Sequence, residues 1–364
     1  MNINDLAVGQ TVVDTDGRRW QRTATAWRGV YTDGRPTGDV VVDKTMARKN
    51  GLRLVATVEA APVVAPTPPV EPEPPIAARG PRVLAENRVG ARIVAGVPFA
   101  EYAAQPGQNV STLKAMLRSP LHYRHAMTSH KTTPAMVLGT AAHVATLEPE
   151  RFGEAFAVWD GGRRAGKDWE QFKADNFERD ILTADERDEA LAIAAAVRAC
   201  PDAMVYLRQG HAEVSMSWQH DEPEMALKGR VDWLTVVDGC DVVVGLKTTR
   251  DLRPREFAAQ AARLCYHWQW AFYYDGFERI TGRKPAMVEI VVESAAPHAV
   301  AVYRIPEHVL ERGRQEYGAA LAQLAQCEAS GVWPGPVVGE VEFDLPGWAY
   351  PADEMTIEDA GEEA

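Results

Sequence analysis

Two residues in the middle of the chain have the types and the spacing to act together on a phosphate ester. Asp232 lies in the strand-like stretch MALKGRVDWLTVV, and Lys247 lies near the end of the next such stretch, CDVVVGLKT. An Asp238-Gly239 turn joins the two stretches, so the two side chains can converge. A carboxylate is a natural ligand for Mg²⁺, and a nearby lysine can orient or deprotonate a water and offset charge at phosphorus. The alternative for this pair is a strand-end salt bridge.

Three further residues could join this pair. His143 lies in GTAAHVATLEPERF, a segment rich in Gly and Ala that can pack closely on a sheet, and imidazole is a borderline ligand for Mg²⁺ or Mn²⁺. Gln269 and Tyr273 are four residues apart and therefore share a helix face, where an amide and a phenol can grip a phosphate or a metal-bound water. The alternatives are a core histidine and aromatic core packing by WQWAFYY.

Seven segments carry a resemblance to a known family when they are taken in order. They are STLKAMLRSPLHYRH, GTAAHVATLEPERF, GGRRAGKDWEQF, AEVSMSW, KGRVDWL, LKTT and YHWQWAFYYDGF. Over most of residues 105–310 the chain resembles the exonuclease VIII-like (RecE-like) branch of the PD-(D/E)XK nuclease superfamily, which is related to RecB-type nuclease domains and phage lambda exonuclease. No single segment is specific, but all seven in this order are.

The resemblance implies an α/β fold with a PD-(D/E)XK, restriction-endonuclease-like core, in which helices flank a mixed central sheet. It implies an exodeoxyribonuclease that depends on Mg²⁺, with Mn²⁺ as a substitute, and that acts on duplex DNA ends in phage-type homologous recombination. It also implies a homo-oligomer, often ring-shaped, beside a single-strand annealing protein. By match, the metal ligands would be His143, Asp232 and the backbone carbonyl of Leu246, and the catalytic residues would be Lys247, Gln269 and Tyr273.

Gly245 is the departure from the family, which carries a metal-binding acid two positions before the lysine. Asp241 shares the strand face by alternation but lies roughly 13 Å away along the strand. Glu213, on the strand-like stretch before that of Asp232, is the better substitute, because the family pattern also carries an acid there. Three interpretations stay open: a knock-out of an active enzyme, a natural site completed by Glu213 or a substrate phosphate, or an impaired nuclease fold that serves as a DNA-binding or recombinase-partner scaffold. We expect Mg²⁺ affinity and cleavage to be poor, with partial rescue by Mn²⁺, and Gly245→Asp to raise cleavage by orders of magnitude.

Basic residues suggest where DNA phosphates could bind. Lys114 and Arg118 make the first helices of the main domain basic, and a compact cluster in a Gly-bearing loop contains Arg163, Arg164 and Lys167. Basic residues on a flexible loop suit phosphate capture at a DNA end. The alternative is a solvated charged loop.

Composition, and the prolines in particular, predict the domain organisation. Residues 1–58 alternate β-branched and polar residues and predict a small β module, and residues 59–80 are a Pro-rich linker with seven prolines. Residues 81–335 read as one exonuclease-like α/β domain, and residues 336–364 as an acidic tail.

The net charge and the cysteines indicate how the protein can bind nucleic acid and which cellular compartment to expect. The formal net charge of −12 opposes non-specific adhesion to nucleic acid, so DNA binding needs a local basic channel. Four scattered cysteines without metal-ligand spacing fit a cytoplasmic protein, and we expect neither a membrane span nor a secretory signal. With the family resemblance, this predicts a phage- or prophage-encoded protein in the cytoplasm of a bacterial host.

Overall fold

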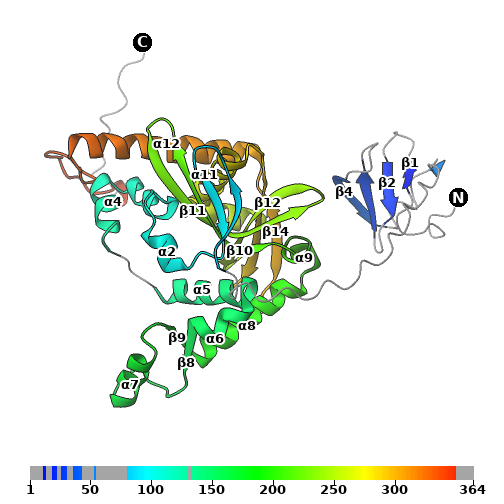
Figure 1. Cartoon of the computed structure of the whole chain (residues 1–364), viewed down its shortest axis with the longest axis horizontal. Helices are drawn as coiled ribbons and strands as arrows, with labels where there is room; N and C mark the ends of the chain where they lie inside the picture. The colour runs from blue at the N-terminus through cyan, green and yellow to red at the C-terminus, as the bar shows by residue number, and fades with distance from the viewer. Residues whose placement is uncertain are drawn as a thin grey trace, which may run out of the picture. The chain divides into compact units, whose positions relative to one another are not determined.

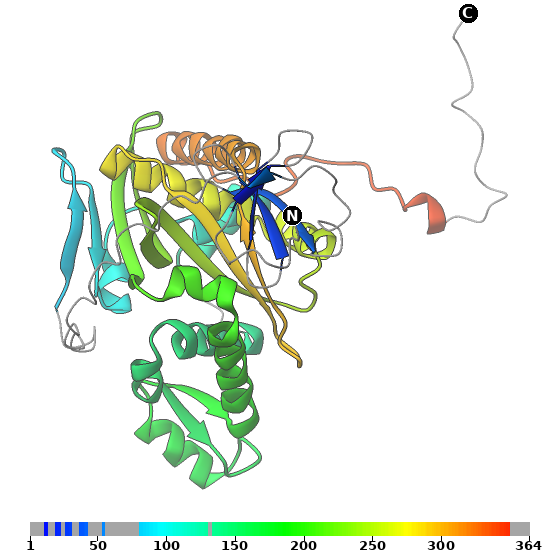
Figure 2. The same ribbon diagram turned by 90° about the vertical axis from the view of Figure 1, so that its right-hand side faces the viewer.

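The computed structural model describes residues 80–129 and 133–349, together with the backbone of five strands nearer the N-terminus. The chain divides into two compact units, Met1–Glu73 and Pro74–Ala364 (Figures 1 and 2). The first unit contains an antiparallel sheet in the order β4-β3-β2-β1-β5. Its strands are β1 (Thr11–Val13), β2 (Arg19–Arg22), β3 (Ala26–Val30), β4 (Pro36–Val42) and β5 (Arg53–Leu54). The Pro-rich linker up to residue 79 and the tail beyond residue 349 lie outside the described residues.

Deleting residues 1–78 is expected to leave a cooperatively folding second unit. The two units form separate clusters, and the proline-rich segment that joins them offers few apolar side chains to bury. Thermal unfolding of the full chain and of the truncated protein should give midpoints for the second unit within about 4 °C, the shift expected from 1 kcal/mol in a domain of this size. Insoluble or unfolded truncated protein would contradict the prediction.

A mixed seven-stranded sheet forms the centre of the second unit. Its order is β14-β13-β12-β11-β10-β7-β6, and neighbouring strands are antiparallel except β12 and β13, which are parallel. The strands are β6 (Arg82–Glu86), β7 (Arg92–Ala95), β10 (His211–His220), β11 (Met225–Val237), β12 (Cys240–Thr249), β13 (Ala286–Glu293) and β14 (Val300–Arg304). The mixed sheet predicted from the sequence is therefore confirmed.

Helices cover this sheet, as Figure 1 shows. The α-helices are α2 (Phe99–Ala104), α3 (Val110–Leu113), α4 (Pro120–Ala126), α5 (Pro134–Leu147), α6 (Phe152–Ala155), α7 (Lys167–Asp175), α8 (Ala184–Ala199), α9 (Pro201–Leu207), α10 (Pro254–Arg263), α11 (Tyr266–Thr281) and α12 (Glu307–Ser330). Short 3-10 turns are η3 (Lys114–Leu117), η4 (Pro149–Arg151) and η5 (Gly347–Ala349). A two-stranded parallel ribbon, β8 (Phe156–Trp159) and β9 (Asp180–Thr183), lies with α7 in an arm below the sheet in Figure 1.

Two apolar clusters show which residues of β12 and β13 face which helices. Val243 and Met287 belong to a cluster with the aromatic side chains of α11 and the inner face of α12. Val242, Val244, Leu246, Val288, Ile290 and Val292 belong to a second cluster with α8 and α9. Because side chains alternate along a strand, Gly245 and Lys247 on β12 and Glu289 on β13 are placed on the α11 side.

Among the described residues, no single helix is long and apolar enough to cross a membrane. The adjoining helices α8 and α9 reach that length and apolarity only when they are taken together, and they meet at 90°.

Candidate metal centre

The Asp232 carboxylate lies where two strands separate. The β11–β12 ladder runs from Val237 opposite Cys240 to Trp233 opposite Val244 and ends there. Just beyond it, the Leu246 N–H donates to Asp232 Oδ2 at 2.8 Å instead of to a backbone carbonyl of β11. Burial alone would raise the pKa of Asp232, but the Lys247 ammonium, His143 and the Leu246 N–H outweigh burial and lower it. Asp232 is therefore held as a carboxylate anion.

Glu213 reaches the same place from the neighbouring strand through a strained backbone. On β10, Ala212 lies opposite Trp233 and Val214 lies opposite Val231, which puts Glu213 opposite Asp232. Its φ of 52° is rare for a residue with a side chain, and such strain concentrates at functional sites. The Arg230 guanidinium donates to Glu213 Oε2 at 2.6 Å. Burial first, and then the Asp232 charge, raise the pKa of Glu213.

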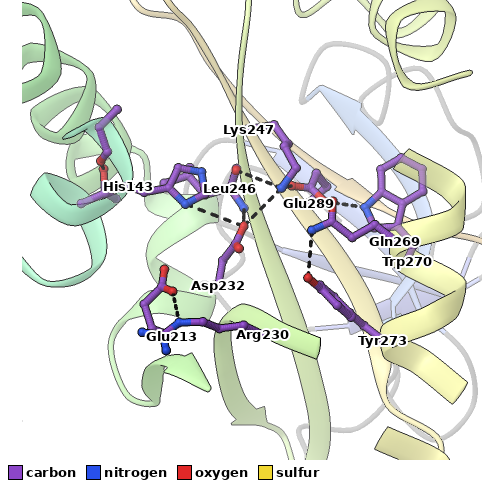
Figure 3. Close-up of polar contacts among 12 residues, drawn as sticks. His143, Glu213, Arg230, Asp232, Leu246, Lys247, Gln269, Trp270, Tyr273 and Glu289 are labelled. Atoms are coloured by element: carbon purple, nitrogen blue, oxygen red, sulfur yellow. Dashed lines mark hydrogen bonds and ion pairs between the residues drawn. The ribbon is translucent and has the colours of Figure 1, made fainter. Parts of the chain in front are cut away.

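His143 completes a group of three possible metal ligands. It lies on α5, whose first turn is capped by the Thr133 side chain. His143 Nδ1 lies 3.9 Å from Asp232 Oδ2, and one ligand atom from each of His143, Glu213 and Asp232 lies within 4.8 Å of the others. Figure 3 shows the imidazole and the two carboxylates turned toward one another. Residues 143, 213 and 232 are thus brought together by one helix and two strands.

The Lys247 ammonium lies against this group and between two carboxylates. Its Nζ is 3.3 Å from Asp232 Oδ2, 3.5 Å from Glu289 Oε1 and 3.3 Å from the Leu246 carbonyl oxygen. Burial alone would lower the pKa of Lys247, but the Asp232 and Glu289 charges outweigh burial and raise it. Lys247 is consequently a cation in this arrangement. The Leu246 side chain is buried in the second apolar cluster, so Leu246 presents only backbone atoms to the site: its N–H to Asp232 and its carbonyl oxygen to Lys247.

Gln269 and Tyr273 approach the site from α11. Gln269 Nε2 donates to the Tyr273 hydroxyl at 3.2 Å, and Figure 3 places both beside Lys247 on the side opposite His143. Tyr273 is buried, and burial raises its pKa, with the Asp232 charge adding to that effect. The phenol is therefore a neutral hydroxyl that can donate or accept a hydrogen bond. The i, i+4 spacing read from the sequence does put the two side chains together.

Glu289 also lies at the site, although its position was not predicted from the sequence. It lies on β13 directly opposite Gly245 of β12, and its side chain is 1% exposed. Trp270 Nε1 donates to its Oε2, and Lys247 lies beside its Oε1 (Figure 3). Its stretch, MVEIVVES, carries one signal: an isolated acid inside an apolar strand that is buried on both faces. Asp241, too far along β12 from position 245 to replace its acid, is paired with Arg283 at 2.6 Å.

The basic residues proposed to bind DNA fall in different places. Lys114 is near the metal centre: its Nζ donates to the Leu264 carbonyl, and burial, followed by the Lys247 charge, lowers its pKa to about 8. Arg118 is exposed just after η3. Arg163 and Lys167 are exposed on the arm.

Arg164 is more restrained than a free loop residue. Its guanidinium donates to the Ile181 carbonyl at 2.9 Å and to Glu186 at 3.0 Å, and it lies over the Trp169 ring. It therefore ties the loop after β8 to β9 and to the start of α8. Within the arm, Arg163 and Lys167 are the more accessible cations for a phosphate.

The donor set fits a divalent cation. Two carboxylates, one imidazole and a backbone carbonyl provide mainly hard oxygen ligands, which Mg²⁺ prefers, with one nitrogen that Mn²⁺ accepts more readily. The Lys247 ammonium beside them can stabilise added negative charge. Such a group of side chains is suited to hydrolysis of a phosphate ester.

The chain is similar to one described protein family and to several solved structures. A family model described as a PDDEXK-like domain of unknown function matches residues 109–343. Among solved structures, the "Putative exonuclease" of Eubacterium rectale is similar at 15% identity, over 66% of this chain and 89% of that one, with a TM-score of 0.48. The protein VC1899 of Vibrio cholerae is similar at 12% identity, over 66% of this chain and 58% of that one, with a TM-score of 0.18. No curated protein gives a significant match.

Proposed function

Because the chain belongs to the family of PDDEXK-like domains, we propose that it is a divalent-metal-dependent nuclease that degrades duplex DNA from its ends. The observation that carries the proposal is the convergence of His143, Glu213 and Asp232 beside the Lys247 ammonium. A structural salt bridge between Asp232 and Lys247 would need neither the imidazole nor the strained backbone at Glu213. An isolated acid–lysine pair is therefore a poorer account of the site.

We assign metal binding to His143, Glu213, Asp232 and the Leu246 carbonyl, with Mg²⁺ as the physiological ion and Mn²⁺ as a substitute. When bound, the cation would polarise a phosphoryl oxygen and lower the pKa of a water. Hydrolysis joins the water oxygen to phosphorus and breaks the bond from phosphorus to a sugar oxygen. The proton lost by the water is balanced by one gained from solvent at the leaving oxygen.

The remaining polar residues have roles that follow from their positions. Lys247, held as a cation, offsets the negative charge that grows on the phosphate oxygens in the transition state. The bonded pair Gln269 and Tyr273 offers an amide and a hydroxyl to orient the attacking water or a phosphate oxygen. Lys114, near Lys247, is the basic residue best placed to hold a phosphate next to the one being cleaved.

The wider setting follows from the family resemblance. We propose action in phage-type homologous recombination in the cytoplasm of a bacterial host, as a homo-oligomer working beside a single-strand annealing protein. Because the net charge is −12, contact with DNA should be confined to the centre and to the exposed cations of the arm.

The test compares linear duplex DNA with the same DNA as a covalently closed circle, in Mg²⁺, in Mn²⁺ and in EDTA. We expect metal-dependent release of nucleotides from the linear form, with the circle left intact because it has no end. Cleavage of both forms would make the protein an endonuclease. Binding of DNA without cleavage in either metal would favour the scaffold interpretation.

A further inference from the structure

The space beside Gly245 is filled by a carboxylate from the next strand. A Cβ atom placed on Gly245 would lie 2.5 Å from both carboxylate oxygens of Glu289 and 2.7 Å from its carboxylate carbon. Side chains of directly opposed residues in a parallel sheet share a face, so Glu289 needs a neighbour without a Cβ to lie where it does. The carboxylate thus occupies the place where a side chain of residue 245 would begin.

One oxygen of this carboxylate is not hydrogen-bonded. Trp270 holds Oε2, whereas Oε1 has no hydrogen-bond partner among the described residues and faces the Lys247 ammonium at 3.5 Å. A buried carboxylate oxygen without a hydrogen bond is costly, and such groups in folded proteins call for a functional explanation. Trp270 fixes the orientation of the carboxylate, so the oxygen without a hydrogen bond points to the side of the sheet where Lys247 and Asp232 lie.

The ammonium shows that this region attracts positive charge. Lys247 Nζ lies within 3.5 Å of an oxygen from Asp232 and of an oxygen from Glu289, so the two carboxylates face one cation together. In the sequence, Gly245, Leu246 and Lys247 stand where a PDDEXK-like domain has D/E-X-K, so Gly245 takes the place of the acid. β12 thus has no acid at position 245, but the Glu289 carboxylate lies where the side chain of residue 245 would begin.

We propose that Glu289 is a metal-binding carboxylate of this centre, supplied from β13 into the space that Gly245 leaves open. The inference rests on the proposed metal-dependent function and adds a ligand to it. It makes the centre a site of three carboxylates and one imidazole, which is a better match to a hard divalent cation than the set without Glu289. It also reverses one expectation from the sequence. Gly245→Asp should give no gain, because its Cβ would displace a carboxylate that is buried and held by Trp270.

The experiment measures Mn²⁺ affinity by calorimetry on the metal-free full-length chain, with melting in EDTA as the check on folding. Glu289→Gln keeps the shape and an oxygen for Trp270 but removes the charge, and it should weaken Mn²⁺ binding by more than about tenfold. Glu293→Gln, the same change four residues further along the same strand, should leave the affinity unchanged. Unaltered Mn²⁺ affinity in Glu289→Gln would overturn the proposal and leave Glu289 as a counter-ion of Lys247.

A relocation pair makes the test independent of that one variant. Glu289→Ala should lose affinity, and Gly245→Asp combined with Glu289→Ala should recover most of it, because the new carboxylate would enter the space that the old one vacates. A double variant that binds no better than Glu289→Ala would show that residues 245 and 289 do not share one ligand position.

DNA degradation is measured in parallel so that the two proposals can fail separately. Wild-type protein that binds Mn²⁺ through Glu289 but leaves DNA ends intact would contradict the nuclease function and support Glu289 as a metal ligand. Glu289→Gln protein that binds Mn²⁺ and degrades DNA like the wild type would support the nuclease function and contradict the assignment of Glu289 as a metal ligand. Wild-type protein without Mn²⁺ affinity would overturn the ligand assignment.

Discussion

Replacing Asp232 by Asn is expected to lower the rate of DNA degradation by at least about 10³-fold, which corresponds to about 4 kcal/mol of lost transition-state stabilisation. Asparagine keeps an oxygen that can accept the Leu246 N–H, so the local strand geometry should survive. It removes an anion whose Oδ2 lies 3.9 Å from His143 Nδ1 and 3.3 Å from Lys247 Nζ. Because removing outer partners of metal ligands already costs 10–100-fold, loss of a central carboxylate should cost more.

The measurement is the initial rate on linear duplex DNA at saturating Mg²⁺ and Mn²⁺, with Mn²⁺ affinity determined on the same preparations. Asp241→Asn is the matched control, because Asp241 is an aspartate of the adjoining strand whose partner is Arg283. That variant should keep the wild-type rate. Comparable rates for Asp232→Asn and Asp241→Asn would remove Asp232 from the centre.

The hairpin that carries the site was predictable from local sequence. Asp238 and Gly239 both have positive φ, 51° and 79°, as the favoured two-residue hairpin turn requires, and Asp-Gly is the residue pair that adopts it readily. The turn fixes the register of β11 against β12 and so brings Asp232 near Lys247. Pairing His143 with this hairpin across 89 positions had no local signal, and only the order of the family motifs predicted it.

Glu289 could not be predicted because its position depends on a tertiary pairing. β12 and β13 are parallel, so the chain must pass through α10 and α11 before it returns beside Gly245. The sequence of β12 and of the two strands before it offers Asp241 and Glu213 as substitute acids, but not a residue 44 positions after Gly245. The parallel register, with Gly245 opposite Glu289, is the missing information. The positive φ of Glu213 could not be predicted either, because no local sequence pattern indicates it.

Replacing Lys247 by Met is expected to destabilise the metal-free protein and to make it unusually responsive to metal. The ammonium is the cation shared by the carboxylates of Asp232, which is 14% exposed, and of Glu289, which is buried. Removing one partner of a buried ion pair typically costs about 3–5 kcal/mol, because the remaining charge is left uncompensated. A divalent cation that binds these carboxylates can supply the missing charge, and it no longer meets the repulsion of the ammonium. Added Mn²⁺ should therefore raise the melting temperature of Lys247→Met by more than it raises that of the wild type.

Lys228→Met is the control that separates this effect from the general cost of losing a buried lysine. Lys228 is also buried in the sheet, but its Nζ donates to the backbone carbonyls of Tyr102, Ala103 and Gln105 and to no carboxylate in the described part of the chain. Its loss should destabilise the fold in EDTA without enlarging the response to Mn²⁺.

Cleavage should fall by about 10²-fold or more in Lys247→Met even at saturating Mn²⁺, because a restored fold still lacks the cation that stabilises the transition state. If Lys247→Met melts like the wild type in EDTA, then the two carboxylates do not depend on Lys247 for their charge balance. If both lysine variants respond to Mn²⁺ equally, the cation does not bind next to the ammonium of Lys247.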